Sequence, residues 1–326
     1  MGAGLRRVGD DWEMPHRSLT PRMAKLLANI ERAGQPPYHS MPAAQARAAY
    51  ERAAEVLEPP RAPLARVEDV RIPVGGGTSL PARLYASSTQ RLPAMLFLHG
   101  GGFTIGSLET HDSLCRQLAL RSGASIVALD YRLAPEHRFP CAVNDAWDAM
   151  HWLAEYGEVL GLYPHKLAVG GDSAGGTLAA VCAIRARDLG IPLCLQVLIT
   201  PGTAAHADSD SHRRLANGFL LEAEGIAWFF DQYIDLAQRT DWRFAPLLAD
   251  ALEGVAPACV VLAESDPLVD EGLAYADRLR MAGVNVELQL ARGVTHDFIK
   301  MGRVLPQAGV AQDAIAGALR HAFSTD

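Results

Sequence analysis

The stretch LAVGGDSAGGTLAA, residues 167–180, decides how the rest of the chain is interpreted. The apolar run 167–170 predicts a buried strand, and the alanine-rich residues after Gly175 predict a helix. Between them, Ser173 stands in the pattern GxSxG, and a sharp strand-to-helix turn needs such glycines because its backbone is crowded. That turn places the Ser173 hydroxyl at the carboxyl edge of a sheet, beside a helix N-terminus that favours a developing anion. The alternative is a glycine-rich connector in which Ser173 is an ordinary helix N-cap.

Apolar strand-like runs alternate with helical segments along most of the chain. A hairpin comes first, with strands at 67–74 and 80–86 joined by three glycines. The later predicted strands cover 94–99, 125–131, 167–170, 193–199, 258–263 and 286–290, and the predicted helices lie near 111–121, 141–156, 175–188, 271–282 and 309–322. Continuous apolar strands that alternate with helices are typical of a parallel sheet buried on both faces. The sequence therefore predicts an α/β protein with a mostly parallel central sheet flanked by helices.

Two regions depart from this alternation. Residues 21–33 and 42–57 carry helical patterns before the first strand, and a proline-rich stretch around Pro59 and Pro60 follows them as a linker. Residues 202–240 combine a polar loop with a helix rich in aromatic side chains. We expect this second region to be an insertion placed over the sheet.

The composition limits the classes of function. The 326 residues carry a net charge of −7, which excludes a generally basic nucleic-acid-binding protein. No run of about 18 apolar residues occurs, so no membrane span is predicted. Five cysteines without a CxxC pair favour reduced thiols, and no apolar secretory segment is visible near the N-terminus. We therefore expect a cytoplasmic protein.

The glycine-rich sequence HGGGF, residues 99–103, directly follows a predicted strand. Consecutive glycines let backbone N–H groups face a cavity without side-chain obstruction. Gly101 and Gly102, together with Ala174 after the serine, are the predicted donors to a tetrahedral oxyanion, and removal of one such donor typically costs about 3 kcal/mol. The alternatives are a flexible loop or a phosphate-binding loop, but the GxGxxG spacing and the lysine of a Walker loop are both missing.

A serine needs a base to take its proton, and that base is a histidine held by a carboxylate. In the chain order Ser, Asp, His, the candidates are Asp266 after the strand at 258–263 and His296 after the strand at 286–290. Both follow strand carboxyl ends, where parallel sheets place their sites. Glu264 and Asp270 are rival acids, and an ordinary turn role for Asp266 before proline is the structural alternative.

Two further groups of residues lie in the region 202–240. Four side chains of the kinds that bind metals occur within seven residues: His206, Asp208, Asp210 and His212. A solvated loop is favoured over a metal site, because no HExxH motif, strand or helix holds these side chains in place. We expect no metal site. Four aromatic residues either line an acyl pocket or pack a helix, with packing favoured for Phe229: Trp228, Phe229, Phe230 and Tyr233.

Taken together, these motifs resemble the hormone-sensitive-lipase-like (bacterial family IV) branch of the α/β-hydrolase carboxylesterases. The matching sequences are HGGG (99–102), DYRLAPE (130–136), GDSAGG (171–176), DPLVDEG (266–272) and His296. The resemblance spans roughly 65–322 and implies the α/β-hydrolase fold with a helical cap. Residues 1–60 would then be an N-terminal helical cap segment, and 61–326 the catalytic domain with a cap insertion at about 202–240.

The resemblance also implies an activity. Ser173 would be the nucleophile, His296 the base and Asp266 the orienting acid of a serine carboxylesterase for short- to medium-chain esters, without metal or cofactor. The partner would be a small-molecule ester, with no nucleic acid. The family often pairs through an edge strand, here 286–290, which makes a homodimer one candidate while the oligomeric state stays open. Two departures are Thr177, where many members have asparagine, and Asp297, where many have glycine. A nearby Asp297 would raise the basicity of His296.

Two other functions stay open at this stage. The same three reacting residues serve an amidase-type serine hydrolase, such as an arylformamidase or deacetylase. A non-catalytic ligand-binding relative is the second alternative, although the chain keeps all three residues.

Overall fold

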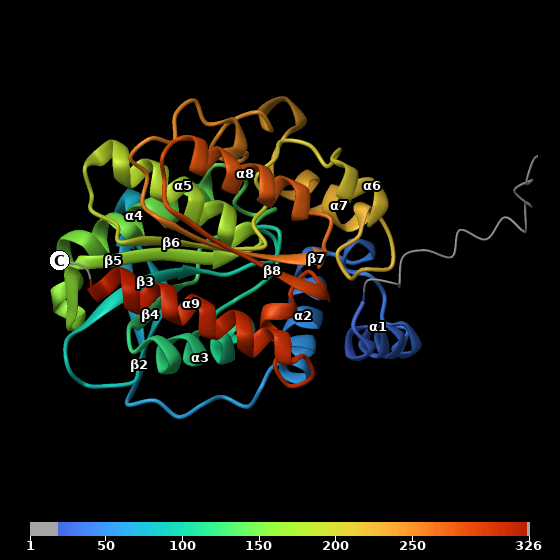
Figure 1. Ribbon diagram of the computed structural model, residues 1–326, viewed down its shortest axis with the longest axis horizontal. Helices are drawn as coiled ribbons and strands as arrows, with labels where there is room; N and C mark the ends of the chain where they lie inside the picture. Colours follow the sequence, from blue (N-terminus) through green and yellow to red (C-terminus); the bar gives the residue numbers. More distant parts are fainter. Residues whose placement is uncertain (1–18, 325–326) are drawn as a thin grey trace, which may run out of the picture.

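A single eight-stranded sheet runs through the middle of the computed structural model, which describes residues 19–324 (Figure 1). Its strands are β1 (Arg66–Val74), β2 (Thr78–Ala86), β3 (Leu92–Leu98), β4 (Ser125–Leu129), β5 (Leu162–Asp172), β6 (Leu195–Ile199), β7 (Ala258–Ser265) and β8 (Val286–Thr295). They follow one another in the order β1-β2-β4-β3-β5-β6-β7-β8. β1 and β2 form the predicted antiparallel hairpin, β2 is antiparallel to β4, and all later neighbours are parallel. The predicted mostly parallel sheet is confirmed.

Helices cover both faces of the sheet because its strands are apolar on both sides. In β3, Met95 and Phe97 belong to one core cluster, whereas Leu96 and Leu98 belong to the other. The face of Met95 carries α3 (Asp112–Ser122) and α9 (Pro306–Ser324). The opposite face carries α4 (Cys141–Tyr156), α5 (Ala174–Leu189) and α8 (Val269–Met281). Burial of the central strands, such as β4 and β6, on both faces is the main stabilising term of such a fold.

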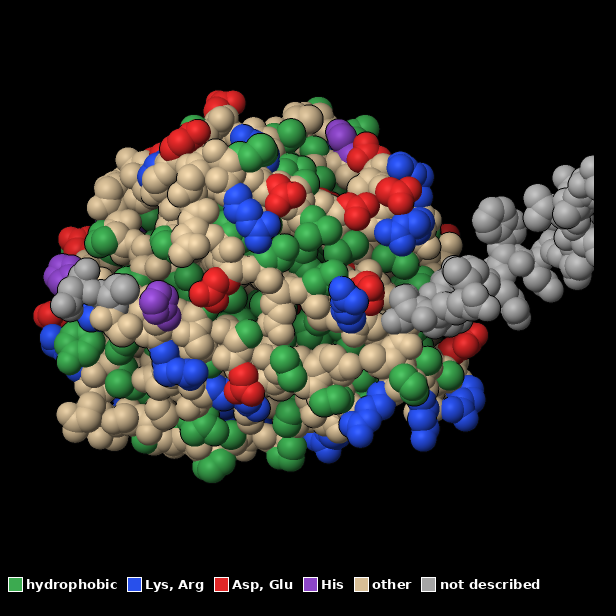
Figure 2. All heavy atoms as spheres, in the orientation of Figure 1, with side chains coloured by type: hydrophobic (Ala, Val, Ile, Leu, Met, Phe, Trp, Pro, Cys, Tyr) green, Lys and Arg blue, Asp and Glu red, His purple; other side chains and the backbone are tan. Residues whose placement is uncertain are grey.

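Four helices lie at the end of the sheet where the parallel strands finish (Figure 1). They are α1 (Pro21–Ala33), α2 (Ala43–Leu57), α6 (Asp210–Arg214) and α7 (Ala223–Tyr233), and we call them the covering helices. Thr20 begins α1 as an N-cap, because its hydroxyl accepts a hydrogen bond from the backbone N–H of Met23. On the visible face, Lys and Arg side chains gather near α1, with acidic and hydrophobic groups among and around them (Figure 2).

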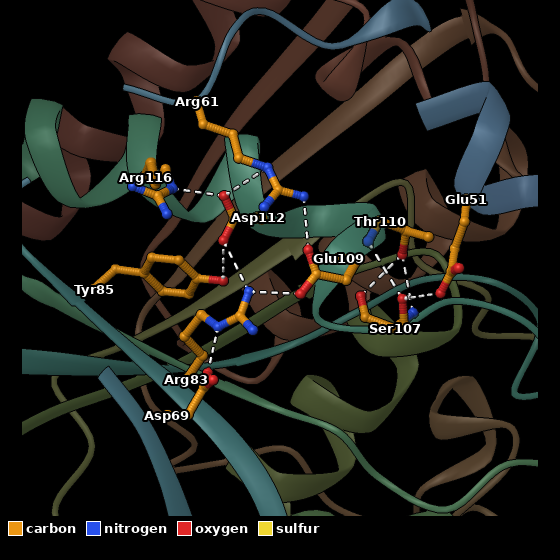
Figure 3. Close-up of polar contacts among 10 residues, drawn as sticks. All are labelled: Glu51, Arg61, Asp69, Arg83, Tyr85, Ser107, Glu109, Thr110, Asp112 and Arg116. Atoms are coloured by element: carbon orange, nitrogen blue, oxygen red, sulfur yellow. Dashed lines mark hydrogen bonds and ion pairs between the residues drawn. The ribbon is translucent and has the colours of Figure 1, made fainter. Parts of the chain in front are cut away.

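A buried carboxylate ties the linker after α2 to the body of the molecule (Figure 3). Asp112 at the start of α3 is fully buried and lies 3.3 Å from Arg61, 3.1 Å from Arg83 and 2.6 Å from Arg116. Tyr85 also donates to it at 3.0 Å. Burial alone would raise the pKa of Asp112, but the arginines hold it below its usual value. The Asp112 carboxylate therefore joins the linker and β2 to α3.

The chemistry of the remaining surface and core adds two facts. None of the helices within 19–324 is both long enough and apolar enough to cross a membrane. All five cysteines are free thiols: Cys115, Cys141, Cys182, Cys194 and Cys259.

Candidate active site

Ser173 stands alone between the end of β5 and the start of α5, at the predicted sharp turn. Its φ of 54° and ψ of −122° lie in a region that residues other than glycine seldom adopt. A Cβ atom on Gly171 or Gly175 would overlap the carbonyl oxygen of Leu98 in β3. Both glycines of the GxSxG pattern are therefore required by close approach of the neighbouring strand. The alternative of an ordinary N-cap is wrong, since the Ser173 side chain makes no capping hydrogen bond.

The three residues predicted from the chain order meet in a hydrogen-bonded row. The distance from Ser173 Oγ to His296 Nε2 is 2.9 Å, and that from His296 Nδ1 to Asp266 Oδ2 is 2.8 Å. Asp266 Oδ1 also accepts from the backbone N–H of Leu268 at 2.9 Å, so the acid side chain is fixed at both oxygens. His296 and Asp266 are buried. The row allows Nδ1–H to donate to Asp266 while Nε2 accepts the serine proton.

Carboxylates around His296 set its protonation. Burial alone would lower the pKa of His296, but Asp266, Asp297 and Asp172 outweigh it and raise that pKa to about 9. Asp266 makes the largest favourable contribution because it is directly hydrogen bonded. Asp297 Oδ1 lies 4.0 Å from His296 Nε2, so the aspartate is near enough to act as the sequence analysis expected.

The glycine-rich loop after β3 takes a backbone shape that only glycine adopts readily. Gly101 and Gly102 have φ values of 118° and 56°. A Cβ on Gly101 would overlap the carbonyl oxygen of Ile105, and one on Gly102 would overlap the ring of Phe229. The loop therefore lies directly below α7, and its glycines are constrained from two sides.

Asp172 braces this loop, a role the sequence did not predict. Its Oδ1 accepts from the backbone N–H of Gly100 at 3.0 Å, and its Oδ2 lies 3.1 Å from His111 Nε2. Burial would raise the pKa of Asp172, but His111 and Lys300 lower it to about 2, so it remains charged. In the sequence, only the position of Asp172 as the second residue of GxSxG pointed to a role near the site. Nothing in the sequence pointed to His111.

The rival acids make other contacts. Glu264 Oε2 accepts from the backbone N–H of Gly293 at 2.8 Å, and Asp270 Oδ2 accepts from that of Ser211 at 2.7 Å. Neither is hydrogen bonded to His296 in the described structure, which leaves Asp266 in that position.

The expectation of a wholly solvated loop at 206–212 is wrong for His212. Ser209 caps the short helix α6 by accepting from the His212 N–H, and Asp270 anchors the same turn. These contacts bury the His212 ring, whose Nε2 lies 3.7 Å from Glu271 Oε2. Among residues 19–324, no group of three or more His, Cys, Asp or Glu side chains is arranged to hold a metal ion.

A largely apolar cavity of about 1210 Å³ opens onto Ser173 and His296. Its walls come from α1, α2, α7 and the glycine loop. Phe229 packs against the cluster of Tyr50 and Ile105, as the sequence favoured, and its ring also covers Gly102 and lines the cavity. Tyr233, one turn later, is fully buried and stacks on Phe103 with 4.0 Å between ring centroids. The same stripe of α7 therefore lines the cavity in its earlier turns, at Ile226 and Phe229, and packs in the interior at its last turn, at Tyr233.

Comparison with known proteins agrees with this fold and site. Residues 95–300 match the family model described as alpha/beta hydrolase fold, and the chain belongs to this family, in its hormone-sensitive-lipase-like branch. An ethyl acetate hydrolase of Pseudomonas putida is 42% identical over 89% of this chain and 95% of its own length.

Other relatives carry similar names. A carboxylesterase of Mycobacterium tuberculosis, NlhH, is 38% identical over 80% of this chain and 84% of its own. The crystal structure of a thermostable esterase from Pseudomonas putida superimposes with a TM-score of 0.92 at 32% identity, covering 96% of this chain and all of that one.

Proposed function

We propose that this protein is a carboxylic ester hydrolase that works through a serine nucleophile and an acyl-enzyme. The observation that carries the proposal is the row from Ser173 through His296 to Asp266, with both hydrogen bonds shorter than 3 Å. The names of the relatives, which are esterases and carboxylic ester hydrolases, support ester bonds over amide bonds.

Each proposed catalytic residue has one role. Ser173 Oγ attacks the ester carbonyl while His296 Nε2 accepts its proton, and Asp266 stabilises the imidazolium that forms. The backbone N–H groups of Gly101, Gly102 and Ala174 hold the oxyanion. His296 then protonates the leaving alcohol. Water then attacks the acyl carbon and gives one proton to His296, which passes that proton to Ser173 Oγ as the bond from Oγ to the acyl carbon breaks and the acid leaves.

The cavity shape supports an apolar substrate. A volume of about 1210 Å³ exceeds the usual range of ligand sites and accepts both an acyl chain and an alcohol group beside Ser173. We propose that residues up to about 60 and the insertion at about 202–240 act as a cap over this cavity; residues 1–18 lie outside the described range. Short- to medium-chain esters, a cytoplasmic location and a homodimer through the edge strand β8 remain predictions.

The test is a panel of p-nitrophenyl esters of increasing acyl length, measured on the wild type and on Ser173→Ala. We expect turnover by the wild type and a loss of about 10⁴-fold or more in kcat for the variant, because the attacking atom is removed. Ser125→Ala is the matched control, since that buried hydroxyl in β4 has no hydrogen-bond partner among the described residues. Undiminished activity of Ser173→Ala would contradict the proposal, and faster turnover of a matched anilide would favour an amidase.

A further inference from the structure

Asp297 lies beside the proposed base, and two other side chains hold it there. Tyr50 donates its hydroxyl proton to Asp297 Oδ2 at 3.1 Å, and Lys300 Nζ lies 3.7 Å from the same oxygen. The other oxygen, Oδ1, lies 4.0 Å from His296 Nε2. The backbone of Asp297 is left-handed, with φ of 62°, which aspartate tolerates better than most residues. One carboxylate therefore faces both the base and a pair of restraining groups.

The restraining pair, Tyr50 and Lys300, is itself tightly connected. Lys300 Nζ donates to the Tyr50 hydroxyl and lies 4.2 Å from the centroid of its ring. Tyr50 belongs to α2 and Lys300 to the short turn η8 (Phe298–Lys300), and both are buried. Burial, and then the charge of Asp297, raise the pKa of Tyr50 well above its ordinary value, so its hydroxyl keeps the proton that it donates.

The distance of 4.0 Å between Asp297 Oδ1 and His296 Nε2 has a chemical meaning. It is too long for a hydrogen bond, yet short enough for a negative charge to stabilise the imidazolium. A carboxylate that moved about 1 Å closer would accept the Nε2 proton itself and compete with Ser173 Oγ, which now lies 2.9 Å away. At 4.0 Å, Asp297 therefore helps His296 to accept the serine proton. At hydrogen-bonding distance it would hold Nε2 in place of Ser173.

We propose that Tyr50 and Lys300 are positioning residues that hold Asp297 at the assisting distance, so that helix α2 forms part of the catalytic apparatus. The inference rests on the proposed function, because it needs His296 to act as the base. It gives the N-terminal helices a role in the chemistry beyond covering the cavity.

Other ionisable groups also face His296. They are Asp266 after β7, Asp172 at the end of β5 and Glu271 in α8. These groups are unchanged in the variants below. Differences between the variants therefore report on Asp297 and its two restraints.

The test compares the pH dependence of kcat and KM for Tyr50→Phe, Asp297→Asn and the double variant. In Tyr50→Phe, a released carboxylate approaches Nε2, so we expect kcat to fall by about ten- to a hundredfold with little change in KM. The acid limb of its pH profile moves to higher pH, because the closer charge favours the protonated base. In Asp297→Asn the limb moves to lower pH, because a negative charge is lost. The double variant behaves like Asp297→Asn, since no carboxylate remains to be held.

Controls separate this role from simple stability. Tyr275→Phe removes another buried tyrosine hydroxyl, one in α8 without a hydrogen-bond partner among the described residues, and leaves the profile unchanged. Lys300→Arg keeps a charged donor and retains more activity than Lys300→Met, which gives a second measurement if Tyr50→Phe unfolds. A wild-type profile for Tyr50→Phe, or additive shifts in the double variant, would overturn the inference while leaving ester hydrolysis intact. Absence of ester turnover by the wild type would instead overturn the proposed function.

Discussion

Ser173 and the glycines near it occupy backbone conformations that most side chains avoid. Ser173 has φ of 54°, and Gly101 in the facing loop has φ of 118°. Such strain persists only where surrounding contacts enforce it, and it concentrates at functional sites. Here the contacts come from Leu98 against the serine turn and from Ile105 against the loop. The close approach of β3 therefore sets the shape of the serine turn, and the return of the chain at Ile105 sets that of the glycine loop.

Gly101 provides a prediction at the scale of one residue. In Gly101→Ala the new methyl group meets the Ile105 carbonyl, which is backbone and cannot move aside cheaply, so the loop must shift. We expect kcat to fall by about 10²- to 10³-fold, the usual cost of a displaced oxyanion donor. The matched control is Gly190→Ala at the end of α5, where φ is also positive, at 67°, but a Cβ meets open space. The measurement is kcat for one ester under steady-state conditions. Equal losses of kcat in Gly101→Ala and Gly190→Ala would show that backbone strain alone is responsible.

At the scale of elements, one stripe of α7 both packs and lines the cavity. Tyr233 is buried against Phe103, whereas Phe229 lies over Gly102 at the cavity. The sequence could not distinguish these two roles, because aromatic residues that lie three or four positions apart satisfy both interpretations. The direction in which α7 crosses the loop was needed to assign them.

Phe229 in α7 provides the second prediction. Phe229→Ala enlarges the cavity beside the proposed oxyanion donors, so short acyl groups lose contact, at about 0.8 kcal/mol for each CH₂ equivalent. We expect KM to rise for acetate esters and the preferred acyl chain to lengthen by about two to four carbons. The measurement is kcat/KM across an acyl-length panel, with Gln232→Ala on the same helix as the control. An unchanged chain-length preference would show that the ring does not contact the acyl group.

Element boundaries show where sequence patterns stop being informative. Helix α4 matches its predicted span 141–156, because its apolar spacing is regular. β8 continues to Thr295 instead of ending near 290, since Ala291 and Thr295 also pair with β7, across a register shift. This extension delivers His296 directly to the site. Pairing with a neighbouring strand is a tertiary effect that local composition does not encode.

For the whole molecule, buried ionisable groups predict how stability changes with pH. Burial raises the pKa of Glu58 and of Glu271 to about 8, and carboxylates raise that of His296 to about 9. All three bind protons in the folded state that the unfolded chain releases, so their stabilisation is lost as pH rises. The pKa of Asp172 is lowered from 3.8 to about 2. Its contribution to the free energy of unfolding is therefore fully present above pH 3.8 and is lost only as the pH falls towards 2.

We therefore expect the free energy of unfolding to decrease from about pH 5 to pH 9. Urea unfolding at intervals of one pH unit measures this trend. Glu58→Gln, which keeps a neutral polar group at a site where Oε1 has no partner among the described residues, should flatten the decrease up to about pH 8. Stability that increases over this range would contradict the assignment of these groups as protonated when buried.

Chain order and motif spacing were sufficient to predict the three residues of the hydrogen-bonded row, because each directly follows a strand of a parallel sheet. The supports around them were not predictable in the same way. Asp172 with His111, and Tyr50 with Asp297, join residues more than 60 positions apart. Such pairs carry no local pattern, since only the folded chain brings them together.

The cluster around Asp112 constrains how this sequence can change. Asp112 contacts Arg61, Arg83 and Arg116, which arrive from the linker, β2 and α3, and Glu109 also pairs with Arg61 and Arg83. A neutral replacement at 112 removes the buried anion from these arginines, and loss of the arginines leaves that anion isolated, so we expect either change alone to destabilise the fold. A replacement in this group therefore has to keep its cations and carboxylates matched, so we expect paired substitutions to be accepted where single ones destabilise the link between the linker and the sheet.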